Sequence, residues 1–224
     1  MTMQVVPTQL TQTFQTALDF AYQQHHTQTR KGPFAIPYLG HLLGVCSLVI
    51  EHGGSETEAI AALLHDTIED VGEAAIPEIE ALFGPEVLAI VQGCTDATRE
   101  AKAQVQDVRA DWLQRKEKYL QGLAEKPASA RLVSLSDKVY NARSIQEDYL
   151  EVGDALWSRF TGGKWGTLWY YRRLAEVFKR TSSENHPQYQ RLVKLLIRTT
   201  HETERLLGVT EHGAGEFRQH FLRM

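Results

Sequence analysis

Long hydrophobic runs, cysteines and internal repeats are scarce or missing in this sequence. None of its 224 residues lies in a run that approaches the ~18 consecutive apolar residues of a membrane-spanning helix. Residues 1–14 are polar and rich in Gln and Thr, which is not the composition of a secretory signal. The two cysteines, Cys46 and Cys94, lie within apolar helical patterns, so we expect buried thiols in a reducing compartment rather than a disulfide. These features predict a cytoplasmic globular protein without a membrane span.

The alternation of β-branched and polar residues that is typical of a strand is also missing. Apolar residues instead recur at helical spacing along nearly the whole chain. Proline, glycine and a Ser55-x-x-Glu58 capping box mark the ends of the expected helices. We expect helices at residues 8–26, 37–52, 55–71, 76–83, 85–95, 107–123, 128–148, 166–181 and 187–207. The fold class predicted from this pattern is all-α.

Charge is small in total but uneven along the chain. The formal net charge of −4 argues against duplex DNA as the main partner. Residues 51–100 contain one arginine against twelve acidic residues, whereas the segments on both sides are net positive. An acidic block between basic flanks suits a site that holds a metal ion and an anionic ligand. A set of water-exposed helix faces would give the same distribution, so charge alone leaves both interpretations open.

The densest group of chemically reactive side chains is the segment 64–70, Leu-His-Asp-Thr-Ile-Glu-Asp. At about 100° per residue, His65, Asp66, Glu69 and Asp70 share one arc of a helix and the aliphatic residues lie opposite. Three carboxylates in one short arc repel one another, and a bound cation relieves that repulsion. A solvated acidic face would look similar, so the segment by itself does not decide between the two.

Two other predicted helices carry complementary polar residues. His41 lies in an otherwise apolar helix, where a histidine needs a partner. Asp137, Asn141 and Ser144 are spaced i, i+4 and i+7 and therefore share one helix face. Asp137 could bind a metal ion while the other two hydrogen-bond a substrate. A hydrogen-bonded core histidine and a water-exposed helix face would account for the same residues.

Taken in order, these segments resemble a known family. The matching pieces are Thr29-Arg30-Lys31, Pro37-Tyr38-Leu39-Gly40-His41, Ala62-Leu63-Leu64-His65-Asp66-Thr67-Ile68-Glu69-Asp70, Phe83-Gly84-Pro85-Glu86-Val87, Thr95-Asp96 and Ser136-Asp137-Lys138-Val139-Tyr140-Asn141-Ala142-Arg143. The ordered set resembles the HD phosphohydrolase superfamily, and within it the (p)ppGpp hydrolase branch of RelA/SpoT-type hydrolase domains and stand-alone small alarmone hydrolases. The resemblance implies an HD-domain helical bundle over residues 1–150, with a C-terminal extension of two helices, residues 151–224, packed on the same domain.

The resemblance also implies a metal centre. One divalent ion, usually manganese with iron or zinc as alternatives, would be held by a mixed nitrogen and carboxylate set. The implied ligands are His41, His65, Asp66 and Asp137. Dinuclear members of the superfamily take further histidines from intervening helices, and this chain has none between His65 and His186. We therefore expect one ion.

Roles in catalysis and substrate binding follow from the same resemblance. Glu69 and Asp70 would position or deprotonate the attacking water. The residues implied to contact the substrate are Arg30, Lys31, Asn141, Ser144 and Arg143. The sequence departs from the alarmone hydrolases where no acidic residue follows Lys31 and where Val71 follows Asp70 in place of a common threonine.

The predicted function is metal-dependent hydrolysis of the 3′-pyrophosphate of (p)ppGpp or a related alarmone, which yields GDP or GTP and pyrophosphate. The expected partner is a small-molecule nucleotide, with no DNA or RNA and no membrane, and a homo-oligomer stays open. Another HD phosphohydrolase, acting on a nucleoside monophosphate or on the phosphate of NADPH, is one alternative. A non-catalytic nucleotide-binding or antitoxin-like protein is the other.

Overall fold

The computed structural model describes residues 8–32, 34–96, 106–181 and 187–223. Its helices are α1 (Gln12–His25), α2 (Leu39–Glu51), α3 (Glu56–Leu64), α4 (Thr67–Asp70), α5 (Ile76–Cys94), α7 (Val108–Gly122), α8 (Ala128–Val152), α9 (Gly163–Thr181), α10 (Pro187–Leu206) and α11 (Ala214–Leu222). Short 3-10 helices lie at Glu73–Ala75, Leu123–Glu125 and Gly153–Arg159. Within the described ranges the one β contact is an isolated bridge between Thr29 and Pro37. The predicted all-α fold is confirmed.

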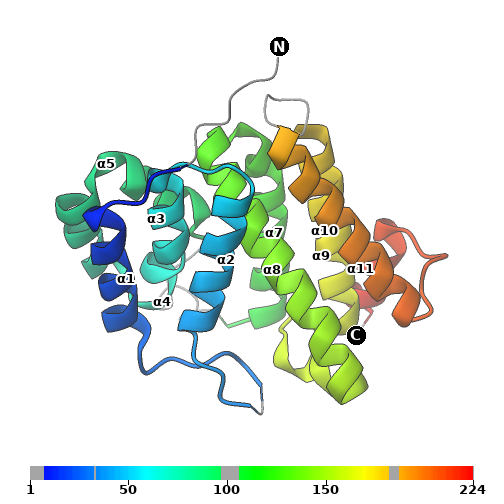
Figure 1. The fold of residues 1–224 in the computed structure, drawn as a ribbon. Coiled ribbons are helices and arrows are strands. Elements are labelled where there is room, and N and C mark those ends of the chain that lie inside the picture. The colour runs from blue at the N-terminus through cyan, green and yellow to red at the C-terminus, as the bar shows by residue number, and fades with distance from the viewer. Residues whose placement is uncertain (1–7, 33, 97–105, 182–186, 224) are drawn as a thin grey trace.

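Helix α8 lies at the centre of the bundle (Figure 1). It packs against α2, α3, α5 and α10, while α9 contacts both α10 and α11. One continuous group of buried apolar side chains extends from Leu42 and Leu63 in the N-terminal helices to Phe178, Leu196 and Phe217 in the C-terminal ones. The C-terminal helices therefore share a hydrophobic core with the rest of the bundle. Among the helices described, none combines the length and apolar character required to cross a lipid bilayer.

Several helix ends follow the signals in the sequence. The Ser55 hydroxyl accepts a hydrogen bond from the Glu58 N–H at 3.3 Å, and the Glu58 carboxylate accepts one from the Ser55 N–H at 2.7 Å, which completes the predicted capping box. Gly84 adopts a φ of +84° and interrupts α5 just before Pro85. Because glycine tolerates positive φ without a steric penalty, this kink separates the two helices expected here.

The helix expected over residues 55–71 is interrupted, which corrects the continuous helix predicted from the sequence. Helix α3 ends before His65 and α4 begins after Asp66. The His65 Nδ1 hydrogen-bonds to the Ala62 carbonyl at 2.8 Å, an acceptor that an uninterrupted helix would offer to the Asp66 N–H. At this break His65 and Asp66 meet at 3.1 Å between Nε2 and Oδ2, although helical spacing would place them about 100° apart.

A third C-terminal helix, α11, was not predicted from the sequence pattern. It spans nine residues and begins after Gly213, whose N–H donates to the Glu216 carboxylate at 2.6 Å. A helix this short is marginal alone and depends on tertiary packing. Phe217 and Phe221 supply that packing because both are buried, and α11 contacts α9. The stabilising contacts are distant in sequence, so local patterning did not reveal the helix.

Gly44 of α2 lies close to Tyr140 of α8, and this contact leads to a stability prediction. A Cβ added at Gly44 would lie 2.0 Å from the Tyr140 ring, whereas one added at Gly40 would meet nothing within 4 Å. We expect Gly44→Ala to lower the free energy of unfolding by about 1–3 kcal/mol, the usual cost of overpacking. Gly40→Ala is the matched control and should be neutral or stabilising. Thermal denaturation measures both, and equal melting temperatures for the two variants would contradict this packing.

Candidate active site

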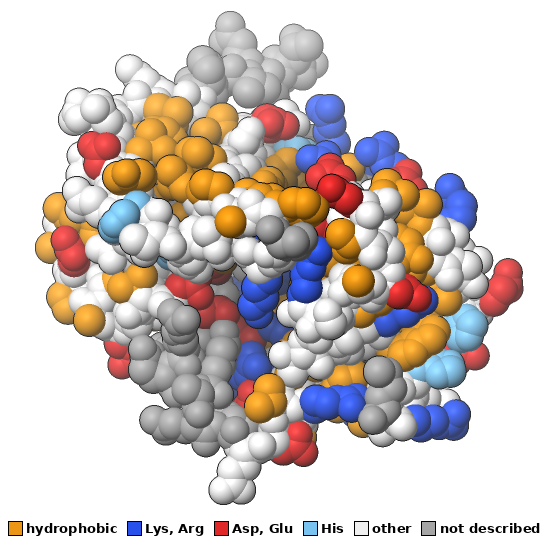
Figure 2. All heavy atoms as spheres, turned by 90° about the horizontal axis from the view of Figure 1, so that it is seen from below, with side chains coloured by type: hydrophobic (Ala, Val, Ile, Leu, Met, Phe, Trp, Pro, Cys, Tyr) orange, Lys and Arg blue, Asp and Glu red, His pale blue; other side chains and the backbone are white. Residues whose placement is uncertain are grey.

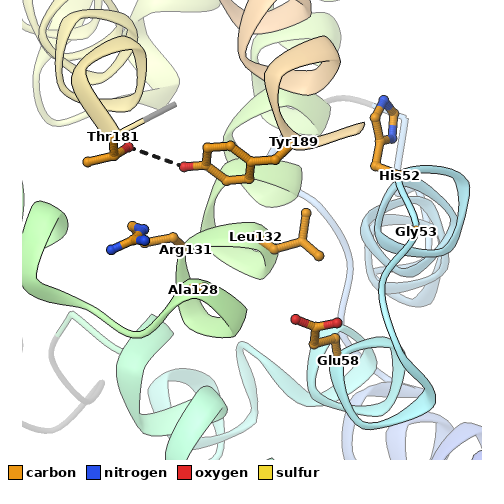
Figure 3. A pocket seen from close by; sticks show the side chains of 8 residues that line it. All are labelled: His52, Gly53, Glu58, Ala128, Arg131, Leu132, Thr181 and Tyr189. Carbon is orange, nitrogen blue, oxygen red and sulfur yellow. Dashed lines mark hydrogen bonds between the residues drawn. The ribbon is translucent and has the colours of Figure 1, made fainter. Parts of the chain in front are cut away.

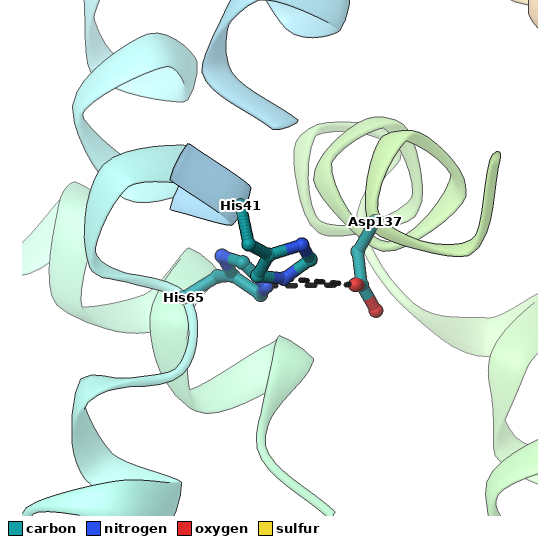
Figure 4. A group of neighbouring side chains, drawn as sticks. All are labelled: His41, His65 and Asp137. Carbon is teal, nitrogen blue, oxygen red and sulfur yellow. Dashed lines mark ion pairs between the residues drawn. The ribbon is translucent and has the colours of Figure 1, made fainter. Parts of the chain in front are cut away.

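Three parts of the bundle bring the predicted metal ligands together. His41 comes from α2, His65 and Asp66 from the break between α3 and α4, and Asp137 from α8. Figure 4 shows the two imidazole rings beside each other, with the Asp137 carboxylate facing them. One ligand atom from each of His41, His65 and Asp137 lies within 4.8 Å of the others. The structure thus gathers residues that are nearly a hundred positions apart in the sequence.

The distances place Asp66 at the same point. The His41 Nε2 lies 3.4 Å from Asp66 Oδ2 and 3.4 Å from Asp137 Oδ1. The His65 Nε2 lies 3.1 Å and 3.7 Å from the same two oxygens. Both imidazoles are almost completely buried, at 2% and 3% exposure. Asp66 therefore lies beside both imidazoles, next to the mutually close group of His41, His65 and Asp137.

The orientation of the His65 ring suits a metal ligand. Its Nδ1 hydrogen-bonds to the Ala62 carbonyl, which turns the Nε2 edge of the ring toward the Asp66 and Asp137 carboxylates. This Nε2 is buried and, among the described residues, makes no hydrogen bond of good geometry, although it lies 3.1 Å from Asp66 Oδ2. An unpaired buried polar atom costs about 1–3 kcal/mol, which a bound cation would offset. Two imidazole nitrogens and two carboxylates form a donor set that fits a divalent transition ion.

The two carboxylates are held by neighbouring donors. Asp137 accepts hydrogen bonds from the Asn141 amide and the Lys138 ammonium, each at 2.5 Å. The Tyr38 hydroxyl donates to Asp66 at 2.6 Å. Burial alone would raise the pKa of Asp137, but the Lys138 ammonium and the two imidazoles outweigh it and lower that pKa. The pKa of Asp66 is likewise lowered by the imidazoles against the effect of burial, so both carboxylates stay ionised and able to bind a cation.

A cavity of about 180 Å³ opens beside these ligands. Its lining contains His65, Asp66, Glu69 and Asp137 together with two lysines and three tyrosines. The predicted catalytic residue Glu69 therefore faces the space next to the metal ligands. Asp70, by contrast, is not among its lining residues and accepts a hydrogen bond from the Gln28 amide at 2.7 Å.

Several residues of this cavity were not singled out from the sequence. Lys116 of α7 lies 2.8 Å from the Asp96 carboxylate, and the buried hydroxyl of Tyr170 on α9 has no hydrogen-bond partner among the residues that the structure describes. Cys94, which the sequence predicted only as a buried thiol, also lines the cavity, and burial raises the pKa of its thiol. No spacing links these residues to the His-Asp segment, because only the packing of α5, α7 and α9 brings them near it. Their position in the fold, and not a sequence motif, identifies them as part of the candidate site.

A second cavity, of about 130 Å³, contains the predicted substrate-binding residues Arg30, Lys31 and Ser144. Arg30 donates from Nη2 to the Asn141 side-chain oxygen at 3.1 Å and lies 5.3 Å from the centre of the Tyr140 ring. Asn141 therefore bridges Arg30 and the metal ligand Asp137. Seen from below, lysine and arginine side chains gather in the middle of the surface, beside acidic ones (Figure 2).

Arg143 is placed differently from the other predicted substrate contacts. It is exposed on α8 and is not among the residues that line either cavity. Its neighbour Ala142 points into the core. The geometry therefore brings Arg30, Lys31, Asn141 and Ser144 to the two cavities but leaves Arg143 outside them.

A third cavity, also of about 130 Å³, lies at the opposite ends of α2 and α8. Figure 3 shows its lining, where the Thr181 and Tyr189 hydroxyls interact at 3.4 Å. Arg131 in this cavity donates to the backbone carbonyls of Ala124 and Lys126. It contains none of the predicted metal, catalytic or substrate residues. The candidate active site is therefore the pair of cavities whose lining residues Asn141 and Arg30 are hydrogen-bonded to each other.

Comparison with known proteins is consistent with this geometry. The HD domain family model matches residues 17–167. The guanosine-3′,5′-bis(diphosphate) 3′-pyrophosphohydrolase MESH1 of Xenopus tropicalis is 36% identical over 132 residues, which cover 58% of this chain and 68% of that protein. The human MESH1 is 34% identical over 131 residues, covering 58% and 67% respectively.

Solved structures share the fold. A metazoan orthologue of SpoT, described as hydrolysing ppGpp, superposes with a TM-score of 0.63 at 23% identity and covers 90% of this chain and 99% of its own. The lmo0812 protein of Listeria monocytogenes superposes with a TM-score of 0.55 at 23% identity, covering 75% and 96%. The HD model match and the MESH1 identities extend over more than half of the chain. The chain therefore belongs to the HD domain family, which implies that it binds a divalent metal ion.

Proposed function

We propose that this protein is a metal-dependent hydrolase that removes the 3′-diphosphate of guanosine-3′,5′-bis(diphosphate) or a closely related nucleotide and releases pyrophosphate. The observation that carries the proposal is the cluster of His41, His65, Asp66 and Asp137 beside a cavity that also contains Glu69. The names of relatives at 34–36% identity support the same reaction. The presence of both histidines and of the carboxylates Asp66, Asp137 and Glu69 argues against a purely non-catalytic role.

The proposed ligands hold one divalent ion, and manganese is the metal we propose, with iron and zinc as alternatives that this donor set also accepts. When bound, such an ion polarises the attacking water and supplies a nucleophile near neutral pH. Glu69 faces the same cavity and accepts the proton of that water. Asp70, held by Gln28, assists by keeping the short helix α4 and its neighbour Glu69 in place.

In the proposed step, the water oxygen bonds to the phosphorus nearest the 3′-oxygen, and the bond from that phosphorus to the 3′-oxygen breaks. The substrate carries several negative charges, which the acidic residues would repel. Lys116 and Lys138 line the same cavity and offset this repulsion. Arg30 and Asn141 are proposed to hold the nucleoside, with Lys31, Ser144 and Arg143 as further substrate contacts. We propose that the protein acts in the cytoplasm on this small molecule.

Removal of a metal ligand generates the first test of the site. We expect Asp137→Ala and His65→Ala each to lose the ion and all measurable turnover, because each removes a donor atom. Elemental analysis should find manganese in the wild type and in the control His26→Ala, an exposed histidine of the α1–α2 connection. Adding manganese should raise the melting temperature of the wild type and of His26→Ala but of neither ligand variant, since a ligand that binds the folded state stabilises it. Undiminished metal in both ligand variants would contradict the assignment.

Glu69→Gln tests the proton acceptor. The change is nearly isosteric and removes basicity, so we expect kcat to fall by about 10²–10⁴-fold, with metal content and melting temperature unchanged. Glu80→Gln, on an exposed position of α5, is the charge-matched control and should retain wild-type kcat. Pyrophosphate release from ppGpp, ppApp, NADPH and nucleoside monophosphates identifies the reaction at the same time. An unchanged kcat in Glu69→Gln would move the role to another residue.

Arg30→Ala tests the nucleotide clamp. A charged contact is worth about 1.5–3 kcal/mol, so we expect at least a tenfold loss of kcat/KM, mainly through a higher KM. Lys31→Ala should act in the same direction and lower kcat as well if the ammonium meets charge on the departing oxygen. Arg180→Ala, exposed on α9, is the control for loss of one positive charge. Wild-type kinetics in the Arg30→Ala, Lys31→Ala double variant would exclude this loop as the clamp.

A further inference from the structure

A buried histidine outside the metal cluster contacts the short helix α4. His25, the last residue of α1, is 1% exposed, and the end of α1 lies beside α4 (Figure 1). Its Nδ1 lies 2.7 Å from the side-chain oxygen of Gln28, and its Nε2 lies 3.4 Å from the hydroxyl of Thr67. Both ring nitrogens of this imidazole therefore face polar groups that connect it to α4.

These contacts reach both ends of α4. Thr67 is the first residue of the helix and Asp70 is the last. The Gln28 amide nitrogen donates to the Asp70 carboxylate at 2.7 Å. His25 thus contacts the start of α4 directly and its end through Gln28. A helix of four residues has little stability of its own, so its position depends on contacts of this kind.

The same chain of hydrogen bonds fixes which group donates at each step. An ionised carboxylate only accepts, so Gln28 presents its amide nitrogen to Asp70 and its oxygen to His25. The Gln28 oxygen then requires a proton on Nδ1 of a neutral His25 ring, and Nε2 is left to accept from the Thr67 hydroxyl. One tautomer of the imidazole therefore satisfies the whole chain.

We propose that His25 is a positioning residue, which holds α4 through Gln28 and Thr67 so that Glu69 is aimed at the attacking water. The inference rests on the proposed function for the role of Glu69. That residue belongs to α4 and lines the cavity beside the metal ligands. A misplacement of about 1 Å at a reacting group can cost about 10²-fold in rate. A proton acceptor on so short a helix therefore needs both helix ends held.

A ring contact extends this role to one of the proposed metal ligands. The His25 imidazole stacks on the Tyr38 ring, with 5.6 Å between the ring centres and 26° between the planes. The Tyr38 hydroxyl donates to Asp66 at 2.6 Å, and Asp66 immediately precedes α4. His25 is thus a common neighbour of the helix that carries Glu69 and of the tyrosine that orients Asp66.

The tautomer and the order of α4 can be measured without turnover. We expect long-range proton–nitrogen NMR spectra of the full-length protein, with the diamagnetic ion zinc added, to place the His25 proton on Nδ1. Gln28→Met removes both amide contacts at similar side-chain length. The N–H groups of Asp70 and Val71, which bond to backbone carbonyls at the start of α4, should then exchange faster with solvent.

Gln23→Met, at an exposed position of α1, is the matched control for these spectra and should leave both signals as in the wild type. A proton on Nε2 of His25 in the wild type would overturn the proposal. So would unchanged exchange of the α4 amides in Gln28→Met, because the hydrogen-bond chain would then not hold the helix.

Kinetics distinguish positioning from packing alone. With pyrophosphate release from ppGpp as the assay, Gln28→Met should lower kcat by about 10–100-fold, the usual scale for an outer partner of a reacting group. KM and metal content should stay close to wild type, because the substrate contacts and the metal ligands are retained. His25→Asn keeps an N–H donor near the place of Nδ1 and should recover most of the kcat that His25→Leu loses.

The outcomes separate this role from the reaction itself. A lower melting temperature with unchanged kcat in Gln28→Met would mean that the chain only stabilises the fold, and would refute the positioning role. A wild type that releases no pyrophosphate would refute the proposed reaction. The exchange of the α4 amides would still decide whether His25 and Gln28 hold the helix, since that measurement needs no substrate.

Discussion

Two buried imidazoles and two carboxylates share one small space where α2, α3, α4 and α8 meet, and the surrounding structure depends on keeping these four side chains together. Ionised carboxylates are costly to bury unless hydrogen bonds or cations compensate them. Here Lys138 and Asn141 hold Asp137, and Tyr38 holds Asp66. The remaining electron pairs of the four side chains face one another, which is the arrangement that a divalent cation stabilises.

The close contact of α2 with α8 follows from the same requirement. Gly44 leaves room for the Tyr140 ring. The same ring also contacts His41, at 5.1 Å between ring centres, and Arg30. Tyr140 thus packs the two helices at the distance that lets His41 and Asp137 meet. The same ring helps to position the arginine proposed to hold the nucleoside. Core packing and the candidate substrate site are parts of one contact.

Asn141 links the two halves of the candidate site. Its amide nitrogen donates to Asp137 and its oxygen accepts from Arg30, so one side chain connects the metal ligands to the second cavity. Both cavities contain cations beside carboxylates, with the lysines Lys116 and Lys138 in the first and the cations Arg30, Lys31 and Arg159 in the second.

The sequence alone determined the all-α class and most helix boundaries, because helical periodicity and capping are local. The resemblance of its ordered His-Asp and Asp-x-x-x-Asn segments to a known family predicted which residues would form the candidate metal cluster. The sequence did not determine the break at His65 and Asp66, since that depends on a side chain taking a backbone acceptor. The sequence likewise did not predict that Lys116 and Tyr170 line the cavity, or that helix α11 forms. These features come from α7, α9 and the end of the chain. Only tertiary packing decides which distant side chains face the cavity, because no local spacing encodes contacts between helices so far apart in sequence.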